Sequence, residues 1–388
     1  MLNLALNDEL EEWTIDLESL PATADLVVKV VRDRYPRLDP PLHARWRHFA
    51  FAGRNLWQEI ASRRNWPNSR ARARAEFDLV VTSVLLDAGA GADWRYHDAA
   101  TGLILGRSEG LALASLRWFE AGGLSNDPSD PLRVDAMALC SVDPRSLHDA
   151  FQSSSGNPLL GADGRASLLN RLGAVIQARP DVFSSMDSPR PGGLFDAISA
   201  RARDGHLPAT AILATLLEAI GPIWQNRPSL DGVALGDCWI HPAFTGAAAA
   251  DHFVPLHKLS QWLSYSLIEP LQKAGVSIDE IDGLTGLAEY RNGGLFVDTG
   301  VLVPRDPSAR SEVHAVSTPF VVGWRAMTVA LLDRVAPLVR ERLGLSAASF
   351  PLARVLEGGT WAAGRLLAQQ RRPGGPPPFQ ISSDGTVF

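Results

Sequence analysis

Residues 255–271 read PLHKLSQWLSYSLIEPL, and this stretch has the spacing of a buried amphipathic helix. At 100° per residue one face is wholly aliphatic, which predicts a core face made of Leu256, Leu259, Leu263 and Leu267. Pro255 suits the first helical position. The opposite face carries two aromatic rings beside polar groups, a combination that is rare on a solvated face, so we expect it to line a ligand site. Its members are Lys258, Gln261, Trp262, Tyr265 and Glu269.

Helical spacing recurs along most of the chain, which predicts a mainly α, multi-helix globular protein. Only 102–106 and 294–303 suggest strands, so the strands should be few and short. The other predicted helices span 22–35, 42–64, 70–86, 107–120, 164–178, 207–220, 320–343 and 346–370.

Proline and glycine clusters suggest the domain organisation. Residues 1–41 should form an N-terminal lead-in helix, and 42–370 a mainly helical catalytic region with sub-boundaries near 122–131 and 187–194. The segment 371–388 contains PGGPPP, which predicts an extended C-terminal tail.

Composition narrows the class of protein. The 388 residues are 46% hydrophobic and carry a formal net charge of −6, which disfavours nucleic acid as a partner. No apolar run approaches the ~18 residues of a membrane span, and the acidic N-terminal segment around Asp8 and Glu9 has the wrong charge for a signal peptide. We therefore expect a soluble cytoplasmic protein. A basic run at 45–74 could be a solvated helix face or a confined anion site.

Several unusual strings identify a family. They are YP at 35–36, HARWRHF at 43–49, LDAGAG at 86–91, RSEG at 107–110, GDCWIH at 236–241, VPLHKLSQW at 254–262, EYRNGG at 289–294 and SDGTVF at 383–388. Together they resemble, from end to end, the fungal uracil-catabolism Urc/Urg proteins, a family also found in bacteria and long catalogued as a domain of unknown function. The chain departs from that pattern at Ala44, Ala288 and Gly323. The resemblance implies a pathway in which ring opening of a ribosylated uracil leaves a urea group attached to ribose phosphate.

A second, partial resemblance concerns the active site. HKLSQ at 257–261 followed by AEYR at 288–291 is similar to paired strings of the queuosine-salvage N-glycosylases. Those proteins are mainly helical and related in fold to DNA glycosylases, so the resemblance implies a DNA-glycosylase-like helical core. It also implies that Lys258 and Glu289 are catalytic, with Glu289 replacing the Asp of that family.

The expected reaction is hydrolysis of the bond between ribose, or ribose phosphate, and a urea-type leaving group. Its transition state resembles an oxocarbenium ion, so a carboxylate is needed near the anomeric carbon. Glu289 could stabilise the cation, activate water or attack covalently. Lys258 would orient Glu289 or bind the sugar or phosphate, and Arg291 offers a fork for phosphate. The alternative for Glu289 and Arg291 is a structural ion pair at a helix or turn end.

Further substrate contacts are expected around the LDAGAG string. Trp94 could stack on a planar urea or base, and Asp87 or Glu109 could accept its N–H groups, with Arg107 nearby. The alternative is a glycine-requiring turn in which Asp87 caps backbone amides. His43 and Arg47 would contact phosphate or else form interhelical hydrogen bonds.

Asp237, His241 and His257 are the remaining candidates. On a helix, Asp237 and His241 would share one face and could join His257 on a divalent metal or on the substrate. We predict no cofactor and no metal, and a small ribosyl compound as the ligand. Two other functions stay open: a metal-dependent amidohydrolase of the same pathway, and a non-enzymic binding partner of a ring-opening enzyme.

Overall fold

The computed structural model describes residues 1–91, 93–183, 188–225 and 227–382. These residues cluster into two compact units, each discontinuous in sequence. Unit 1 comprises Met1–His43, Asn226–Gln261 and Ile281–Ser382. Unit 2, among the described residues, comprises Ala44–Gln225 and Trp262–Glu280. The N-terminal segment therefore belongs to the same unit as the last helices of the chain, and 122–131 and 188–194 both lie inside unit 2.

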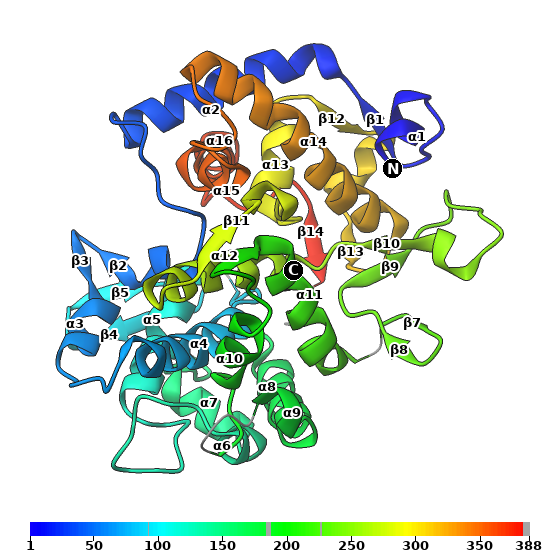
Figure 1. Cartoon of the computed structure of the whole chain (residues 1–388). Helices are drawn as coiled ribbons and strands as arrows, with labels where there is room; N and C mark the ends of the chain where they lie inside the picture. Colours follow the sequence, from blue (N-terminus) through cyan, green and yellow to red (C-terminus); the bar gives the residue numbers. More distant parts are fainter. Residues whose placement is uncertain (92, 184–187, 226, 383–388) are drawn as a thin grey trace. The chain divides into compact units, whose positions relative to one another are not determined.

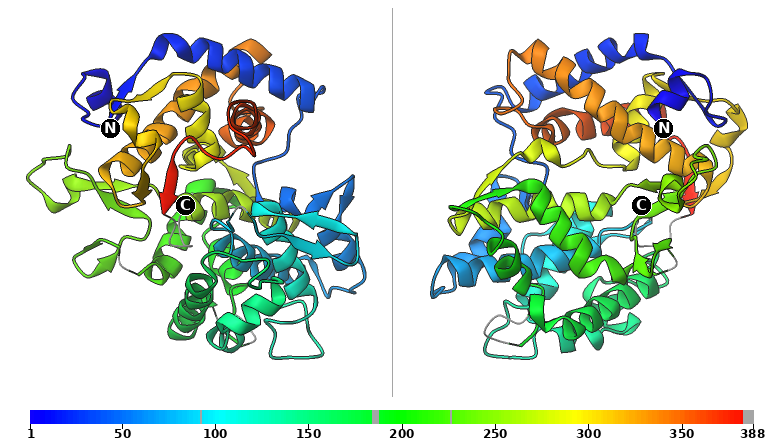
Figure 2. Two further views of the ribbon diagram at one scale, coloured as in Figure 1. Left: turned by 180° about the vertical axis from the view of Figure 1, so that it is seen from behind. Right: turned by 45° about the vertical axis from the view of Figure 1, so that its right-hand side comes forward.

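Unit 1 is built around a helix whose N-terminus carries Glu289. This helix, α13 (Tyr290–Asp298), lies between α14 (Pro319–Leu343) and α16 (Trp361–Arg371), as Figure 1 shows. α2 (Leu20–Arg34) runs alongside α14, which both views of Figure 2 also show. The remaining helical segments of unit 1 are α1 (Leu2–Leu6), η1 (Leu17–Ser19), η4 (Ala249–His252), η5 (Ile281–Gly283), η6 (Pro307–Arg310), α15 (Leu352–Val355) and the π-helical turn η7 (Leu356–Thr360).

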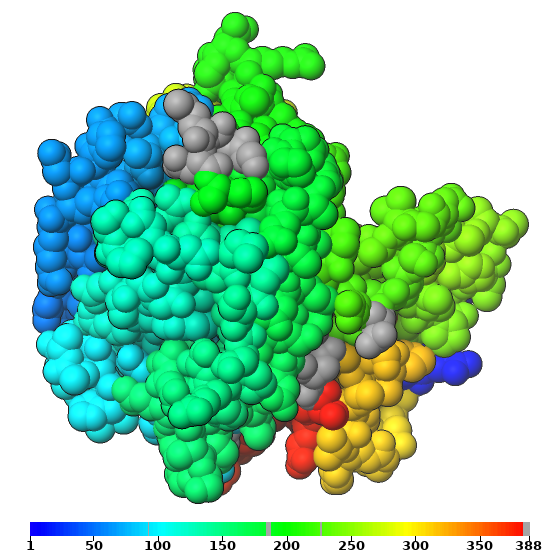
Figure 3. Space-filling view, turned by 90° about the horizontal axis from the view of Figure 1, so that it is seen from below, coloured from blue at the N-terminus to red at the C-terminus, as the bar shows by residue number. Residues whose placement is uncertain are grey.

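Short strand pairs connect these helices. The antiparallel pairs are β1 (Trp13–Ile15) with β12 (Leu302–Pro304), β9 (Cys238–Ile240) with β10 (Phe253–Pro255), and β7 (Ser229–Leu230) with β8 (Val233–Ala234). β13 (Val313–Ala315) pairs in parallel with β14 (Gln380–Ser382), and the two are visible in Figure 3 as adjoining gold and red residues. Residues Gln380–Ser382 of the expected C-terminal tail are thus extended backbone paired with a strand. Residues 383–388 of that tail lie outside the described range.

Unit 2 is a second helical assembly with a few two-stranded ribbons. Its strand pairs are β2 (Ala50–Phe51) with β3 (Arg54–Asn55), β4 (Tyr96–Asp98) with β5 (Leu103–Leu105), and β6 (His206–Pro208) with β11 (Ser277–Asp279). Its helical segments are η2 (Arg45–Phe49), α3 (Leu56–Ser62), α4 (Ser69–Leu85), α5 (Arg107–Glu120), α6 (Ala136–Cys140), α7 (Pro144–Ala150), α8 (Ala162–Ala178), α9 (Pro180–Phe183), α10 (Gly193–Ser199), α11 (Ala209–Ile220) and η3 (Gly221–Ile223). α12 (Lys258–Lys273) crosses the break between the units after Gln261.

The mainly α prediction is confirmed, and the long periodic helices fall close to their predicted bounds. α5 matches the predicted 107–120, and α14 matches 320–343. The bounds of α14 follow from its ends: the Thr318 hydroxyl accepts the Val321 N–H, Pro319 occupies the first turn, and Gly344 ends the helix at φ +69°. Within the described residues, no helix is both long and apolar enough to cross a membrane.

Four predicted elements are wrong in detail. The expected helix 42–64 is interrupted by the β2–β3 hairpin, and 346–370 is interrupted by the π-helical turn η7. Residues 294–298 continue α13 instead of forming a strand, because two glycines there allow α13 to pack closely on its neighbours. α12 begins at Lys258 and not at Pro255, since Phe253–Pro255 pairs with β9.

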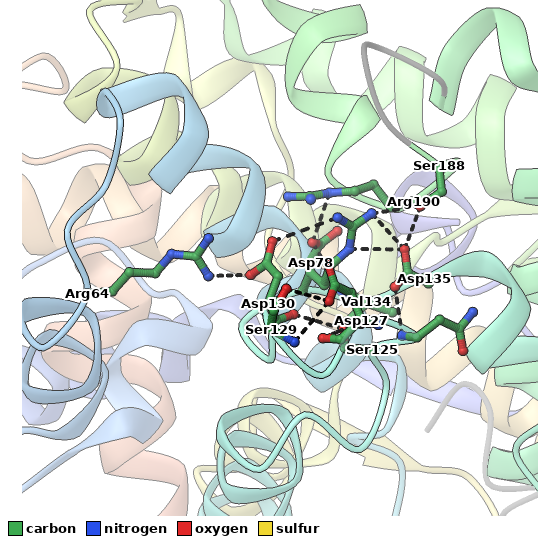
Figure 4. Close-up of polar contacts among 12 residues, drawn as sticks. Arg64, Asp78, Ser125, Asp127, Ser129, Asp130, Val134, Asp135, Ser188 and Arg190 are labelled. Atoms are coloured by element: carbon green, nitrogen blue, oxygen red, sulfur yellow. Dashed lines mark hydrogen bonds and ion pairs between the residues drawn. The ribbon is translucent and has the colours of Figure 1, made fainter.

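The predicted sub-boundary at 122–131 is tied firmly into unit 2 by a buried carboxylate network (Figure 4). Asp78 of α4 is fully buried and accepts the N–H groups of Val134 and Gly192 at 3.2 and 2.6 Å. The Arg190 guanidinium lies 3.2 Å from the same carboxylate. Burial raises the pKa of Asp78 to about 6 despite these partners. Within the segment itself, the Asn126 N–H donates to Asp135 Oδ2 at 2.9 Å, and Asp130 forms ion pairs with Arg64 and Arg133, so this glycine- and proline-rich segment is an anchored loop of unit 2.

Candidate functional site

Glu289 is the N-cap of α13. Its Oε2 accepts the Arg291 N–H at 2.7 Å and its Oε1 accepts the Asn292 N–H at 2.6 Å. The side chain is only 8% exposed. Burial raises its pKa, although the two backbone N–H groups and then the positive charges of Lys258 and Arg291 oppose that rise. Glu289 is therefore a buried carboxylate at a helix N-terminus whose charge interacts with that of Lys258.

Lys258 is held near this carboxylate by Asp237. The backbone N–H of Lys258 donates to Asp237 Oδ2 at 2.9 Å, and the Lys258 side chain is 9% exposed. His257, which precedes it, has a left-handed backbone at φ +46° and donates its N–H to the Asp237 carbonyl at 2.9 Å. A non-glycine residue in that conformation is strained, and such strain often accompanies functional sites. The turn into α12 is therefore built to place Lys258.

A guanidinium connects the Asp237 segment with the segment that carries Glu289. Arg325 of α14 binds Asp237 in a bidentate manner, with Nη1–Oδ1 at 2.9 Å and Nη2–Oδ2 at 2.7 Å. Its Nε donates to the carbonyl of Ala288 at 3.3 Å, directly before Glu289. Gln261 supports the same segment, since its Oε1 accepts the Thr285 N–H at 3.1 Å. These bonds fix the Lys258 turn and the Glu289 turn in one frame within unit 1.

The electrostatics of Asp237 are the reverse of those of Glu289. Burial opposes ionisation of Asp237, but the Arg325 charge and the hydrogen bonds of Arg325 and Trp239 outweigh it and hold the pKa at about 2. Trp239 Nε1 donates to Oδ1 at 2.7 Å. Burial lowers the pKa of His257, and Asp237 only partly offsets this effect. Asp237 is thus a permanently charged organiser of the site.

The metal alternative rests on a shared helix face of Asp237 and His241, and the structure has no such face there. Asp237 and His241 flank strand β9 and do not share a helix face, so the expected helical spacing is wrong. Asp237 is already committed to Arg325 and Trp239. His241 accepts the Ala243 N–H at Nδ1, and its Nε2 lies 3.7 Å from Glu12. Across the described ranges, no group of three or more His, Cys, Asp or Glu side chains is arranged to hold a metal ion.

Two other candidates of unit 1, Arg291 and His43, contact other groups of the protein. Arg291 is 4% exposed, and its Nη1 donates to the Gly375 carbonyl at 2.9 Å while its guanidinium lies 5.0 Å from the Tyr290 ring centroid. His43 Nδ1 lies 2.8 Å from Glu357 Oε2 within the π-helical turn η7. Both side chains are buried, so a phosphate could reach them only through the interior of this unit.

The candidates from the LDAGAG region belong to unit 2. Asp87 Oδ2 forms an ion pair with the fully buried Arg45 at 3.2 Å, and the charge of Glu109 also attracts Arg45. Arg107 and Glu109 are half-buried in the first turn of α5. Trp94 is fully buried, and its Nε1 donates to the Phe151 carbonyl at 2.9 Å. Asp87 is thus paired with a buried arginine, and Trp94 is a core indole of the same unit.

The aromatic face of α12 is divided by the unit break. Lys258 and Gln261 belong to unit 1, whereas Trp262 and Tyr265 belong to unit 2 and are 4% and 0% exposed. In unit 2 the Arg45 guanidinium lies 5.4 Å from the Trp262 ring centroid. Arg47, also of unit 2, forms an ion pair with Glu269 of α12. The aliphatic face is buried as predicted.

The basic run at 45–74 is largely neutralised by acidic partners within unit 2. Arg54 pairs with Glu59 and Arg72 with Glu76, while Arg70 and Arg74 both reach Asp196. The sequence leaves two alternatives for this run, a solvated helix face or a confined anion site. In the structure these arginine charges form ion pairs instead.

Sequence reasoning missed three residues of the Glu289 region. Arg325 carries no local signal, because its partners lie far away in sequence. Asn292 belongs to the quoted EYRNGG string but was given no role, and Thr360 lies in a predicted continuous helix. Only the unexpected π-helical turn marks Thr360, and such turns are frequent at functional sites.

Comparisons with known proteins agree with the resemblance seen in the sequence. The family model DUF1688, described as a protein of unknown function, matches residues 1–388. The chain is 38% identical over 400 residues to Protein urg3 of Schizosaccharomyces pombe, an alignment covering 100% of this chain and 95% of that protein. It is 36% identical over 380 residues to Uracil catabolism protein 4 of Lachancea kluyveri, covering 90% of this chain and 85% of that protein.

Proposed function

The chain belongs to the DUF1688 family, and from that premise we propose that it is a uracil-catabolism hydrolase that cleaves an N-ribosyl bond. One relative is named for uracil catabolism. The family resemblance implies an intermediate in which a urea group is attached to ribose or ribose phosphate. The proposed reaction adds water across the bond between C1′ and the urea nitrogen, giving the free sugar and urea.

The observation that carries this proposal is the buried pair of Glu289 and Lys258. Cleavage of the C1′–N bond places positive charge on the sugar, and a carboxylate in a water-poor environment stabilises such charge strongly. The Lys258 charge favours the ionised form of Glu289, which burial alone would disfavour. Lys258 therefore keeps the carboxylate available for the reaction.

The hydrogen bonds of Glu289 disfavour one of its three possible roles, which is covalent attack on the sugar. Each carboxylate oxygen already accepts a helix N–H, so the group is fixed and its nucleophilicity is reduced. We assign Glu289 to stabilising the cationic sugar and taking a proton from the attacking water. The proton removed from water balances the one that the leaving urea nitrogen gains, so no other reactant is required.

Release of urea tests the proposal directly. The purified protein is incubated with ribosylurea and with its 5-phosphate, and free urea is measured. Glu289→Gln should lower kcat by about 10²–10⁴-fold, because one side chain that stabilises transition-state charge is worth that much. Glu341→Gln, an exposed carboxylate at the end of α14, is the matched control and should leave kcat unchanged. Absence of urea release by the wild type from both compounds would overturn the proposal.

A further inference from the structure

The side chain of Asn292 is buried without hydrogen bonds. It is 0% exposed, and neither Oδ1 nor Nδ2 has a hydrogen-bond partner within the described residues. A carboxamide offers two donors and an accepting oxygen, and burying them unpaired is costly. Nearly all buried polar side chains in folded proteins are paired, so an exception calls for an explanation such as a ligand. Asn292 is therefore a buried carboxamide whose hydrogen-bonding capacity a polar ligand would satisfy.

Asn292 lies on the catalytic side of α13. It stands three residues after Glu289, and residues at this spacing share a helix face. Its own N–H donates to Glu289 Oε1 at 2.6 Å. The Asn292 carboxamide thus follows the carboxylate by three residues, about one helical turn.

Close packing prevents α13 from turning this amide toward solvent. A Cβ on Gly293 would lie 2.7 Å from Trp324 Nε1 and 2.8 Å from Thr328 Oγ1, so α14 presses directly on the α13 backbone. A Cβ on Gly364 would lie 2.0 Å from the Arg291 carbonyl oxygen, so α16 does the same from another side. The direction of the Asn292 side chain is therefore fixed by the packing of the helix.

A second unpaired group lies at the same end of α13. Gly364 of α16 meets Arg291, and Arg372, just after α16, binds Asp298 at the end of α13 through 2.7 and 2.6 Å contacts. The two helices therefore run in the same direction. Thr360, one turn before Gly364, must lie beside the N-terminus of α13. It is 0% exposed, and its hydroxyl has no partner in the part of the chain that the structure describes.

We propose that Asn292 binds the urea-type leaving group and selects for it. Oδ1 accepts an N–H of the leaving group while Nδ2 donates to its carbonyl oxygen, the two-point pairing by which one carboxamide recognises another. The Thr360 hydroxyl supplies an additional polar contact at that end of the helix. This inference rests on the proposed N-ribosyl hydrolysis and adds the residue that reads the leaving group. A site built to pair with a carboxamide discriminates strongly against ligands that leave it unpaired.

Two substrates with different leaving groups test this selectivity. Ribosylurea needs the pairing, whereas a 4-nitrophenyl riboside in the same phosphorylation state has neither an N–H nor an amide carbonyl to offer. Asn292→Ala and the isosteric Asn292→Asp should each lower kcat/KM for ribosylurea by about 10- to 100-fold and change that for the nitrophenyl compound less than about 3-fold. Gln370→Ala removes an exposed carboxamide of α16 and is the control. Equal losses on both substrates, or none on either, would overturn the inference.

A binding measurement separates this inference from the proposed reaction. The side-chain amide resonances of Asn292 are assigned by their loss in Asn292→Asp and followed by NMR during titration with N-methylurea. A saturable shift supports the carboxamide site even if the wild type releases no urea, an outcome that would sink only the hydrolase proposal. An unmoved resonance would show that a permanent buried water satisfies Asn292, and the inference would fail while hydrolysis could stand.

Discussion

Asp237 and Glu289 are both buried carboxylates of unit 1, yet they are used in opposite ways. Asp237 receives two guanidinium hydrogen bonds from Arg325, one from the Trp239 indole and one from the backbone of Lys258. Among the residues that the structure describes, Glu289 receives hydrogen bonds from two backbone N–H groups, those of Arg291 and Asn292. The pKa of Asp237 is held at about 2, whereas burial raises that of Glu289. The charged partner Arg325 thus separates the carboxylate whose pKa is lowered from the one whose pKa burial raises.

Loss of Arg325, the cationic partner of Asp237, should have the largest effect on the difference between the two carboxylates. Replacing it by Met leaves Asp237 buried and unpaired, and we expect a loss of about 3–5 kcal/mol in the free energy of unfolding. Denaturant titration measures the loss. Arg334→Met, an exposed change nine residues along the same helix, should cost less than about 0.5 kcal/mol. A similar small cost for both variants would mean that Asp237 does not depend on this partner.

Because the pKa of Asp237 is lowered in the folded protein, the free energy of unfolding should decrease as the pH falls. Its folded pKa of about 2 lies below the ordinary value of 3.8, so its contribution is present above about pH 4 and is lost as pH falls toward 2. The expected loss is about 2 kcal/mol. Unfolding free energies between pH 2 and 5 should flatten in Asp237→Asn relative to the wild type. An unchanged slope in that variant would assign the acid sensitivity to other groups.

Stability should depend far less on the charge of Glu289. Its raised pKa means that its contribution is complete below pH 4.5 and decreases as pH rises through the folded pKa, the opposite of Asp237. Glu289→Ala removes the N-cap and should cost about 1 kcal/mol, whereas Glu289→Gln retains one accepting oxygen and should cost less. Thermal unfolding of the two variants checks the order. A cost above about 3 kcal/mol for Glu289→Gln would identify Glu289 as part of a structural ion pair.

What the sequence could predict follows from how local each feature is. α5 and α14 can be predicted from their apolar periodicity and, for α14, from its capping residues and Pro319. α13 gives no such signal, because Gly293 and Gly294 lower its helix propensity; Gly293 is explained only by the close approach of Trp324 and Thr328. Tertiary packing decides such a segment.

The site shows the same division between local and distant information. The catalytic pairing of Lys258 with Glu289 stays a prediction from the family strings, which no spacing rule would suggest; the structure adds that the Lys258 charge lowers the pKa of Glu289. Arg325 and the unpaired Asn292 depend on contacts between segments distant in sequence, so a single sequence gave them no role. The extended span around Asp237 was taken for a helix, because a strand of three residues is too short to show alternation.

The smallest expected effect concerns the charge of Lys258. Because its positive charge lowers the pKa of Glu289, Lys258→Met should raise that pKa further. If ionised Glu289 is the active form, the acidic limb of the kcat/KM profile for ribosylurea should move to higher pH by up to about one unit, equivalent to about 1.4 kcal/mol. Lys273→Met, which removes a more exposed ammonium at the far end of α12, should leave the limb in place.

In the Glu289→Gln background the Lys258 change should add little, since groups that act as a unit are non-additive. An acidic limb that does not move in Lys258→Met would show that the ammonium does not act on Glu289, and full additivity in the double variant would assign Lys258 a separate task such as phosphate binding.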